Sequence, residues 1–486
     1  MVKLQRWFWK GILPLLLGTL VLWLGWSRWP PGPFAPNPGA QRMPAKAANQ
    51  LIAPVSLPFR GTASCSAQGC HGAIEPVVQA DAHTCLHNEY GAWIHDPHAN
   101  AYHVLFQERS KQISDLLQSD KPEDKRKPAH EDPRCLACHT NPLLALQPQD
   151  SPLVRQEKWF GVGCESCHGS ANQWLVAHTS KAWRTKPCKE KWDQHKMVPV
   201  ADPARRAETC AGCHVGAPPS KDLPAREVNH DLIAAGHPRL QFEFRTFQAN
   251  MVPHWRSKQT AEGHLWAVGQ LVTAQAALKL LAYRAAPDKD SYRVGFDKPA
   301  WPEFAEYDCF ACHHSLTGPS WRQQAIQVPP RRRPGAVPWG SWYFALLRTS
   351  TGDLQRIMQH PRPDREQAAD KAQALREQLQ KLQGQIAKRT RDQDDLALDR
   401  KRLLALIEDT HLAGILGWDH AEQLYLASHA LNHSQADPAI AKIFDELTPL
   451  RTLPRGFDSP HSSPRNPVAF DPNRFLNLFI SLRKHL

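Results

Sequence analysis

Four stretches of the chain place two residues between two cysteines and follow the second cysteine directly with a histidine. They are Cys135, Cys138 and His139; Cys164, Cys167 and His168; Cys210, Cys213 and His214; and Cys309, Cys312 and His313. In this pattern two thiols bond to the vinyl groups of a c-type haem, and the adjacent imidazole ligates the iron. Cysteine pairs also build tetrahedral zinc sites, which do not require the histidine. Histidine makes up only 25 of the 486 residues, so its presence after all four pairs predicts haem.

A wider version of the motif, with four residues between the cysteines, occurs at Cys65, Cys70 and His71. Its thiols and imidazole are still suitably placed, so we expect five covalently attached haems c. Cys85 and Cys188 remain outside the motifs. They could form a disulfide in an oxidising compartment or stay as thiols.

The formal net charge of +12 taken alone would suit an anionic partner. Five haems would bring two propionates each, so about ten negative charges would leave the loaded protein close to neutral. The basic balance therefore compensates for cofactor. The chain has no basic run with interleaved aromatic residues, so we expect no nucleic-acid partner.

The N-terminal segment 1–29 has the composition of a signal-anchor. Lys3, Arg6 and Lys10 precede the uncharged apolar segment 11–26, and a positive region followed by an apolar one directs a chain to export. The apolar run is intermediate between a signal-peptide core and a full membrane span. No small-residue cleavage site follows it closely, and tryptophans flank it as at a membrane interface. We expect an uncleaved transmembrane anchor in the cytoplasmic membrane, with the bulk of the chain in the periplasm or extracytoplasmic space.

The remaining composition predicts four further parts. A Pro/Ala-rich tether at 30–58 precedes a multihaem cytochrome c domain at 59–320, whose loops are rich in proline and glycine. This domain lacks the apolar periodicity of a conventional core, so haems would supply the buried volume. It contains one strong helix, expected at 260–285. A linker at 321–362 leads to a C-terminal helical region at 363–486.

The C-terminal region begins with an apolar stripe at helical spacing. Its members are Ala368, Ala372, Leu375, Leu379, Leu382 and Ile386. The stripe is too short for a committed coiled coil, and further helices are expected at 396–416 and 421–431. We therefore expect a helical hairpin or small bundle, with oligomerisation through the stripe as an alternative. The predicted fold class is mainly α and loop-rich, without a strand-rich domain.

The second axial ligand decides what each iron can do. An iron with a protein ligand on both faces of the haem (a closed iron) transfers electrons. An iron with a free face (an open iron) can bind a small molecule. The chain has few methionines for this role, so bis-His ligation is expected, and with it low reduction potentials. The candidates are His83, His87, His95, His98, His103, His178, His230, His237, His254 and His264.

Two stretches resemble the cytochrome c-554 family of tetrahaem electron carriers, which take electrons from hydroxylamine oxidoreductase. The first is Gly161-Val-Gly-Cys-Glu-Ser-Cys-His-Gly169, followed by His178. The second is Trp93-Ile-His-Asp-Pro-His98-Ala-Asn-Ala-Tyr102. The resemblance covers roughly 62–218 and implies that His98 and His178 are distal ligands. In that family one haem lacks a distal protein ligand.

The chain also departs from this family. Its first motif is wider, a fifth haem is expected at Cys309, and the C-terminal helices have no counterpart in the small carriers. The segment Asn229–Arg239 is the expected source of a further distal ligand, because His230 and His237 lie seven residues apart and would share a helix face.

Three functions are open. The leading one is a membrane-tethered multihaem protein that relays electrons between redox partner proteins. The second is a pentahaem reductase or oxidase of small nitrogen or sulfur compounds with one open haem. Pentahaem nitrite reductases are similar in haem count, but many have lysine in place of one motif histidine, and no Cys-x-x-Cys-Lys occurs here. The third is a structural subunit whose C-terminal helices dock a larger respiratory complex.

Overall fold

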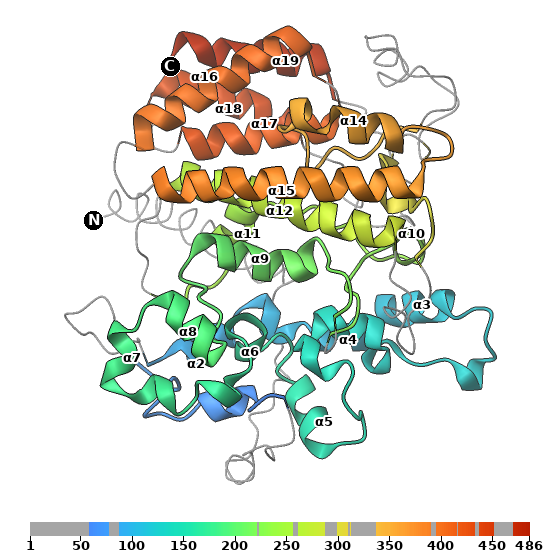
Figure 1. Cartoon of the computed structure of the whole chain (residues 1–486), viewed down its shortest axis with the longest axis vertical. Helices are drawn as coiled ribbons and strands as arrows, with labels where there is room; N and C mark the ends of the chain where they lie inside the picture. Colours follow the sequence, from blue (N-terminus) through green and yellow to red (C-terminus); the bar gives the residue numbers. More distant parts are fainter. Residues whose placement is uncertain are drawn as a thin grey trace, which may run out of the picture. The chain divides into compact units, whose positions relative to one another are not determined.

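The computed structural model describes residues 58–76, 87–220, 223–255, 261–286, 299–309, 312, 337–389, 395–415, 417–432, 437–451 and 470–486. Within these ranges the chain is mostly helical, which confirms the mainly α expectation (Figure 1). Its only strand-like pairings there are isolated bridges between Ala217 and Arg226 and between Tyr307 and Trp339. The anchor and tether, Cys85, His83 and His313 lie outside the described residues.

The region of the predicted haem motifs consists of short helices joined by loops. Its α-helices are α2 (Glu89–Trp93), α3 (Glu108–Leu117), α4 (Pro133–His139), α5 (Pro152–Lys158), α6 (Cys164–His168), α7 (Lys181–Thr185), α8 (Cys188–His195), α9 (Pro203–His214), α10 (His230–Ala234) and α11 (Phe244–Asn250). Two of them start on an Asp-Pro pair: the Asp132 carboxylate accepts from Arg134 N at α4, and Asp202 caps α9 in the same way. Proline suits the first helical position because its missing N–H would be unpaired there.

The long helix α12 (Glu262–Ala285) confirms the helix expected at 260–285 and forms the centre of the larger apolar core. It contacts α9, α11, α15 (Arg365–Arg389) and α17 (Trp418–Leu431). Among the described residues it is the one helix long and apolar enough to cross a membrane, but 72% of its apolar window is buried inside the fold. That burial is typical of a core helix.

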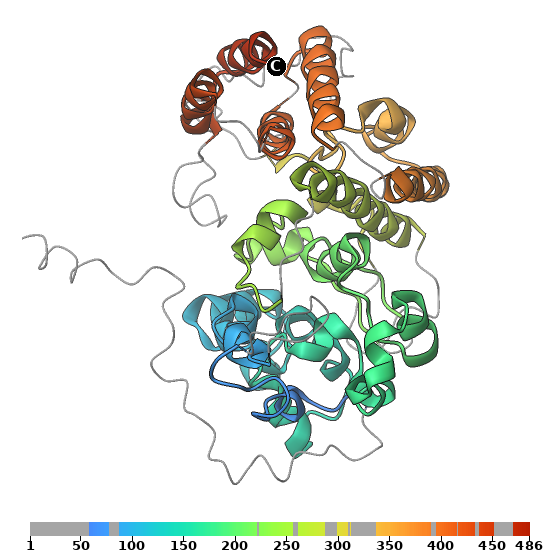
Figure 2. The same ribbon diagram turned by 90° about the vertical axis from the view of Figure 1, so that its left-hand side faces the viewer.

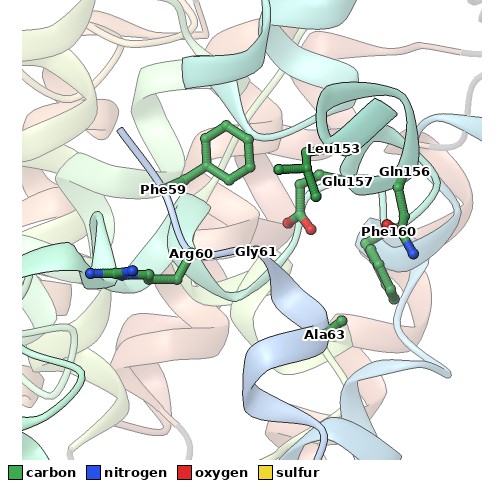
Figure 3. Close-up of a pocket in the computed structure, with 8 residues that line it drawn as sticks. All are labelled: Phe59, Arg60, Gly61, Ala63, Leu153, Gln156, Glu157 and Phe160. Atoms are coloured by element: carbon green, nitrogen blue, oxygen red, sulfur yellow. The ribbon is translucent and has the colours of Figure 1, made fainter. Parts of the chain in front are cut away.

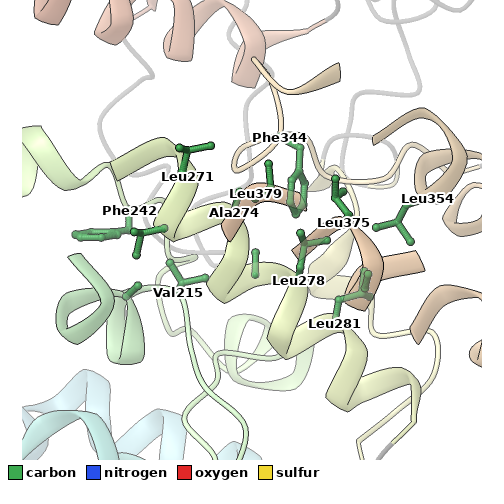
Figure 4. Packing of buried hydrophobic residues seen from close by; sticks show 14 of the residues in the cluster. Val215, Phe242, Leu271, Ala274, Leu278, Leu281, Phe344, Leu354, Leu375 and Leu379 are labelled. Carbon is green, nitrogen blue, oxygen red and sulfur yellow. The ribbon is translucent and has the colours of Figure 1, made fainter. Parts of the chain in front are cut away.

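The apolar stripe of the C-terminal region packs within the chain. Leu375 and Leu379 of α15 lie against the α12 face that carries Leu278 and Leu281 (Figure 4). Leu382, further along the stripe, remains 41% exposed. The buried part of the stripe is therefore occupied by α12, whatever the oligomeric state.

The remaining C-terminal helices form a second apolar cluster. They are α16 (Asp395–Ala413), α17, α18 (Pro438–Arg451) and α19 (Pro472–Ser481), while α14 (Arg348–Met358) packs on α15. Figure 2 shows them, in orange to red, grouped together. The expected helices at 396–416 and 421–431 correspond to α16 and α17, so a bundle rather than a hairpin forms. The domain limits at 320 and 363 stay a prediction, since α12 and α15 share one core.

Candidate haem centre

The motif helices present cysteines and histidine in a common arrangement. Helices α4, α6 and α9 each end on the motif histidine, which places the two thiols one turn apart on the same side. The wider first motif achieves its spacing with a turn instead: the 3-10 helix η2 (Thr62–Cys65) ends, and His71 N donates to Cys65 O (3.2 Å). The four residues between Cys65 and Cys70 therefore form a loop, and His71 lies next to Cys65.

Three motif histidines face a second imidazole. The ring centres of His71 and His178 are 6.2 Å apart and nearly parallel, at 13°. Those of His214 and His98 are 5.9 Å apart. His139 and His237 are separated by 6.4 Å.

These separations match the chemistry of a haem iron. An imidazole nitrogen binds a transition metal at about 2 Å, and the ring centre lies ~1.1 Å behind it, so two imidazoles on opposite sides of one iron have centres ~6.2 Å apart. All three pairs fall within a few tenths of an ångström of that spacing. The residues present therefore fit an iron held between them.

Most of these rings are oriented by a hydrogen bond at Nδ1. His139 Nδ1 lies 2.8 Å from Ala101 O and His237 Nδ1 lies 2.8 Å from Pro238 O. His178 Nδ1 contacts Leu175 O in the same way. The other two contacts are to carboxylates: His71 to Glu89 (2.9 Å) and His98 to Asp96 (2.7 Å). An Nδ1–H that donates to oxygen leaves the Nε2 lone pair free, which is the usual arrangement of metal-ligating histidines.

His168 differs from these three. Among the described residues no imidazole is in ring contact with it, and its Nδ1 is buried without a hydrogen-bond partner. Its pKa is lowered to about 4, first by burial and then by the nearby imidazoles of His254 and His71. His254 is therefore close enough to His168 to act on it electrostatically, although the two rings are not in contact.

The segment between His230 and His237 does not form the expected common helix face. Helix α10 ends at Ala234, and Gly236 takes a φ of +119°, a conformation that favours glycine. The chain therefore turns before His237. His230 lies against Phe304 (5.7 Å between ring centres), whereas His237 faces His139. The shared-face prediction was wrong because the helix is only five residues long.

The last motif is only partly described. Cys309 and Cys312 are in the described part, and His313 is outside it. Of the remaining candidates, His95 is exposed, and the His103 ring packs on Trp159 at 5.3 Å. His87 takes a positive φ of 64°.

Thiols from different motifs lie together. Cys65 is a close neighbour of Cys164, and Cys138 is a close neighbour of Cys213. Cys167 is close enough to Cys210 for the two thiols to interact electrostatically. The fold thus brings the first motif to the third and the second motif to the fourth.

Two buried glutamate side chains, which sequence reasoning missed, hold the first and third motifs together. Glu165, inside the third motif, accepts hydrogen bonds from the backbone N–H groups of Arg60 (3.0 Å), Gly61 (2.7 Å) and Ala171 (2.7 Å). Glu157 of α5 accepts from Thr62 N (2.9 Å) and Thr62 Oγ1 (2.7 Å).

Figure 3 shows the Glu157 carboxyl group beside Gly61, in a pocket lined also by Phe59, Leu153 and Phe160. The segments that carry Thr62 and Gly163 approach each other closely, because a Cβ on Gly163 would meet Thr62 Oγ1 at 2.0 Å. A glutamate between the motif cysteines was the available sequence signal, although its partners are far along the chain.

Comparison with known proteins gives one match. Residues 81–169 match the family described as cytochrome c554 and c-prime, a stretch that includes His98 and the second and third motifs. No curated protein matches the chain, and no solved structure does. The motifs and this match agree on covalently bound haem c and on electron transfer. The protein is a c-type cytochrome that resembles the cytochrome c554 and c-prime family over residues 81–169.

Proposed function

We propose that this protein relays electrons through five covalently bound haems, most of them held by two histidines. The observation that carries the proposal is the set of three imidazole pairs at the spacing of two ligands on one iron. An iron closed on both faces exchanges electrons without binding substrate, and two imidazoles without an axial methionine keep its potential low.

The pairs support the following ligands for three of the haems. His71 and His178 serve the first motif, His139 and His237 the second, and His214 and His98 the fourth. For the fifth motif, His313 is the proximal ligand and His230 the distal one. Support for His230 comes from its position, since Glu303 Oε1 accepts from His230 N at 2.8 Å and thereby ties α10 to the segment before Cys309.

The thiol contacts support an order of haems. Cys65 with Cys164 joins the first haem to the third, Cys167 with Cys210 joins the third to the fourth, and Cys213 with Cys138 joins the fourth to the second. Electrons would pass along this series. The protein's contribution is to fix the spacing of the cofactors and to set their potentials through axial ligands and burial.

The location and the partners follow from the same proposal. Haem c is a cofactor of proteins that typically work outside the cytoplasm. Segment 1–29 would anchor the chain in the cytoplasmic membrane with the bulk in the periplasm or extracytoplasmic space, and 30–58 would serve as the tether. The partners are redox proteins.

A second candidate function is favoured by His168. With no imidazole in ring contact among the described residues, the third haem would be the open one. An open iron near the half-buried His254 suits reduction or oxidation of small nitrogen or sulfur compounds.

Electron paramagnetic resonance of the oxidised, haem-loaded protein tests the ligand assignment. His237→Ala should convert one low-spin haem into a high-spin one. His237→Met should keep that haem low-spin and raise its potential, because axial methionine raises it. His95→Ala, at an exposed histidine, is the control and should leave the spectrum unchanged. An unaltered spectrum in His237→Ala refutes the assignment.

The haem count and the native spectrum complete the test. Mass spectrometry should show five haems; four would leave the Cys65 motif empty. A native high-spin signal that shifts with nitrite or hydroxylamine would favour the second function.

A further inference from the structure

The segment after the third motif forms a small module with its own apolar base. Trp183 of α7 is buried in one cluster with Trp174, and the His195 ring of α8 packs on Trp183 at 5.0 Å between ring centres. Val198 N then donates to His168 O (2.9 Å), which fastens the end of the module to the third motif. The tryptophan cluster and this hydrogen bond thus fix the position of α7 and α8 (green in Figure 1) relative to the third motif.

This outer face is strongly basic. Between Lys181 and Lys196 the chain has six basic residues and two acidic ones, a formal excess of four positive charges. Both acidic residues are already paired, Glu190 with Lys186 and Asp193 with Lys189. Among the described residues no carboxylate pairs with the other four, which are Lys181, Arg184, Lys191 and Lys196.

An aromatic side chain lies within the basic face. Trp192 is 38% exposed, and the Lys196 ammonium lies over its ring at 5.9 Å from the centroid. An exposed tryptophan with a surrounding rim of charges is typical of protein interfaces, where aromatic residues are enriched at the centre and polar ones at the rim.

The face lies beside the first of the imidazole pairs. The 3-10 helix η9 (Ala177–Thr179) carries His178 and contacts α7. His178 in turn faces His71 at 6.2 Å. A protein bound on α7 and α8 would therefore be close to the first haem.

We propose that α7 and α8 form the docking surface for an acidic redox protein that exchanges electrons with the haem held by His71 and His178. The inference rests on the proposed function, since it requires that haem. One electron passes between the partner's redox centre and the iron; one is oxidised as the other is reduced, and no bond forms. The excess positive charge attracts the acidic partner and raises the association rate at low salt.

The test uses the full-length, haem-loaded protein and a reduced, acidic plant-type [2Fe–2S] ferredoxin as the probe. The variant Lys181→Glu/Arg184→Glu cancels the excess of four charges at two exposed positions that lack ion pairs. Arg400→Glu/Lys401→Glu makes the same change in net charge at exposed residues of α16. Stopped-flow absorbance gives the second-order rate of haem reduction as a function of ionic strength.

The wild-type rate should be high at low ionic strength and fall as salt is added. The α7 variant should be slower by about tenfold or more at low salt, the scale of electrostatic steering, and should lose most of its salt dependence. The α16 variant should stay within about twofold of wild type. Equal slowing in both variants, or in neither, would overturn the proposal.

Two measurements on the same samples separate this inference from the proposed function. Haem content by mass and complete reduction by dithionite report on the electron carrier itself, so their failure would refute the proposed function. Intact haem with an unchanged ferredoxin rate would refute only the docking surface. Sedimentation with phosphatidylserine vesicles tests a lipid partner: binding lost only in the α7 variant would assign the face to a membrane and overturn the proposal.

Discussion

The buried carboxyl of Glu157 makes the stability of this protein depend on pH in a predictable direction. Its side chain is inside the fold, since the residue is 5% exposed, and Thr62 is its hydrogen-bonding partner. Burial raises its pKa from 4.5 to about 8; the bonds from Thr62 oppose this rise, and the neighbouring Glu165 adds to it. In the folded protein this carboxyl is therefore neutral at pH 7.

The sign follows from proton counts. Between pH 4.5 and 8 the folded state keeps a proton that the unfolded state has released. The free energy of unfolding therefore falls as pH rises, by up to about 1.4 kcal/mol per pH unit. The contribution is complete below pH 4.5 and lost above about pH 8. Across the window it amounts to roughly 5 kcal/mol at most.

Glu157→Gln removes this titration and keeps the shape of the neutral acid. The variant should match wild type near pH 4.5 and become progressively more stable than wild type toward pH 8. Guanidinium unfolding of the haem-loaded protein, followed by tryptophan emission from pH 5 to 8, measures the difference. Glu123→Gln, at an exposed glutamate, is the control and should not change the slope. Parallel pH profiles for wild type and Glu157→Gln would refute the argument.

Two further substitutions test what holds the C-terminal half. Leu278→Ala, at a fully buried site between α12 and α15, should lower the free energy of unfolding by about 2–5 kcal/mol, and a loss below 1 kcal/mol would contradict the assigned packing. Arg284 is buried and binds Glu227 (2.8 Å) and Glu306 (2.6 Å). Because Arg284→Gln leaves both carboxylates without their cation, it should cost about 3–5 kcal/mol in the same assay. An equally stable variant would show that water or other groups solvate them.

Periodicity located the elements but not their partners. The helix expected at 260–285 was found at Glu262–Ala285, because a long apolar run between breakers leaves few alternatives. The apolar stripe on α15 could also be predicted from the sequence. The helix that packs on it could not, since an apolar face shows that it will be buried but not which surface will bury it. The stripe packs on α12, from the other half of the chain.

The expectation for His230 and His237 failed for a local reason. Spacing of seven residues places two side chains on one face only if the helix continues through both. Here α10 ends at Ala234 and the chain turns at Gly236, so the two imidazoles face different neighbours. A glycine before the second histidine was the signal for this stop.

The sequence by itself determined the chemistry of this cytochrome. Covalent haem attachment needs two thiols and an imidazole at fixed local spacing, and such spacing can be recognised in the sequence without knowledge of the fold. Only the tertiary structure decided which histidines meet. His98 follows the first motif yet faces His214 of the fourth, and His178 follows the third yet faces His71 of the first. The opposite side of an iron is reached by whichever segment the whole fold brings there, and no local rule of spacing extends that far.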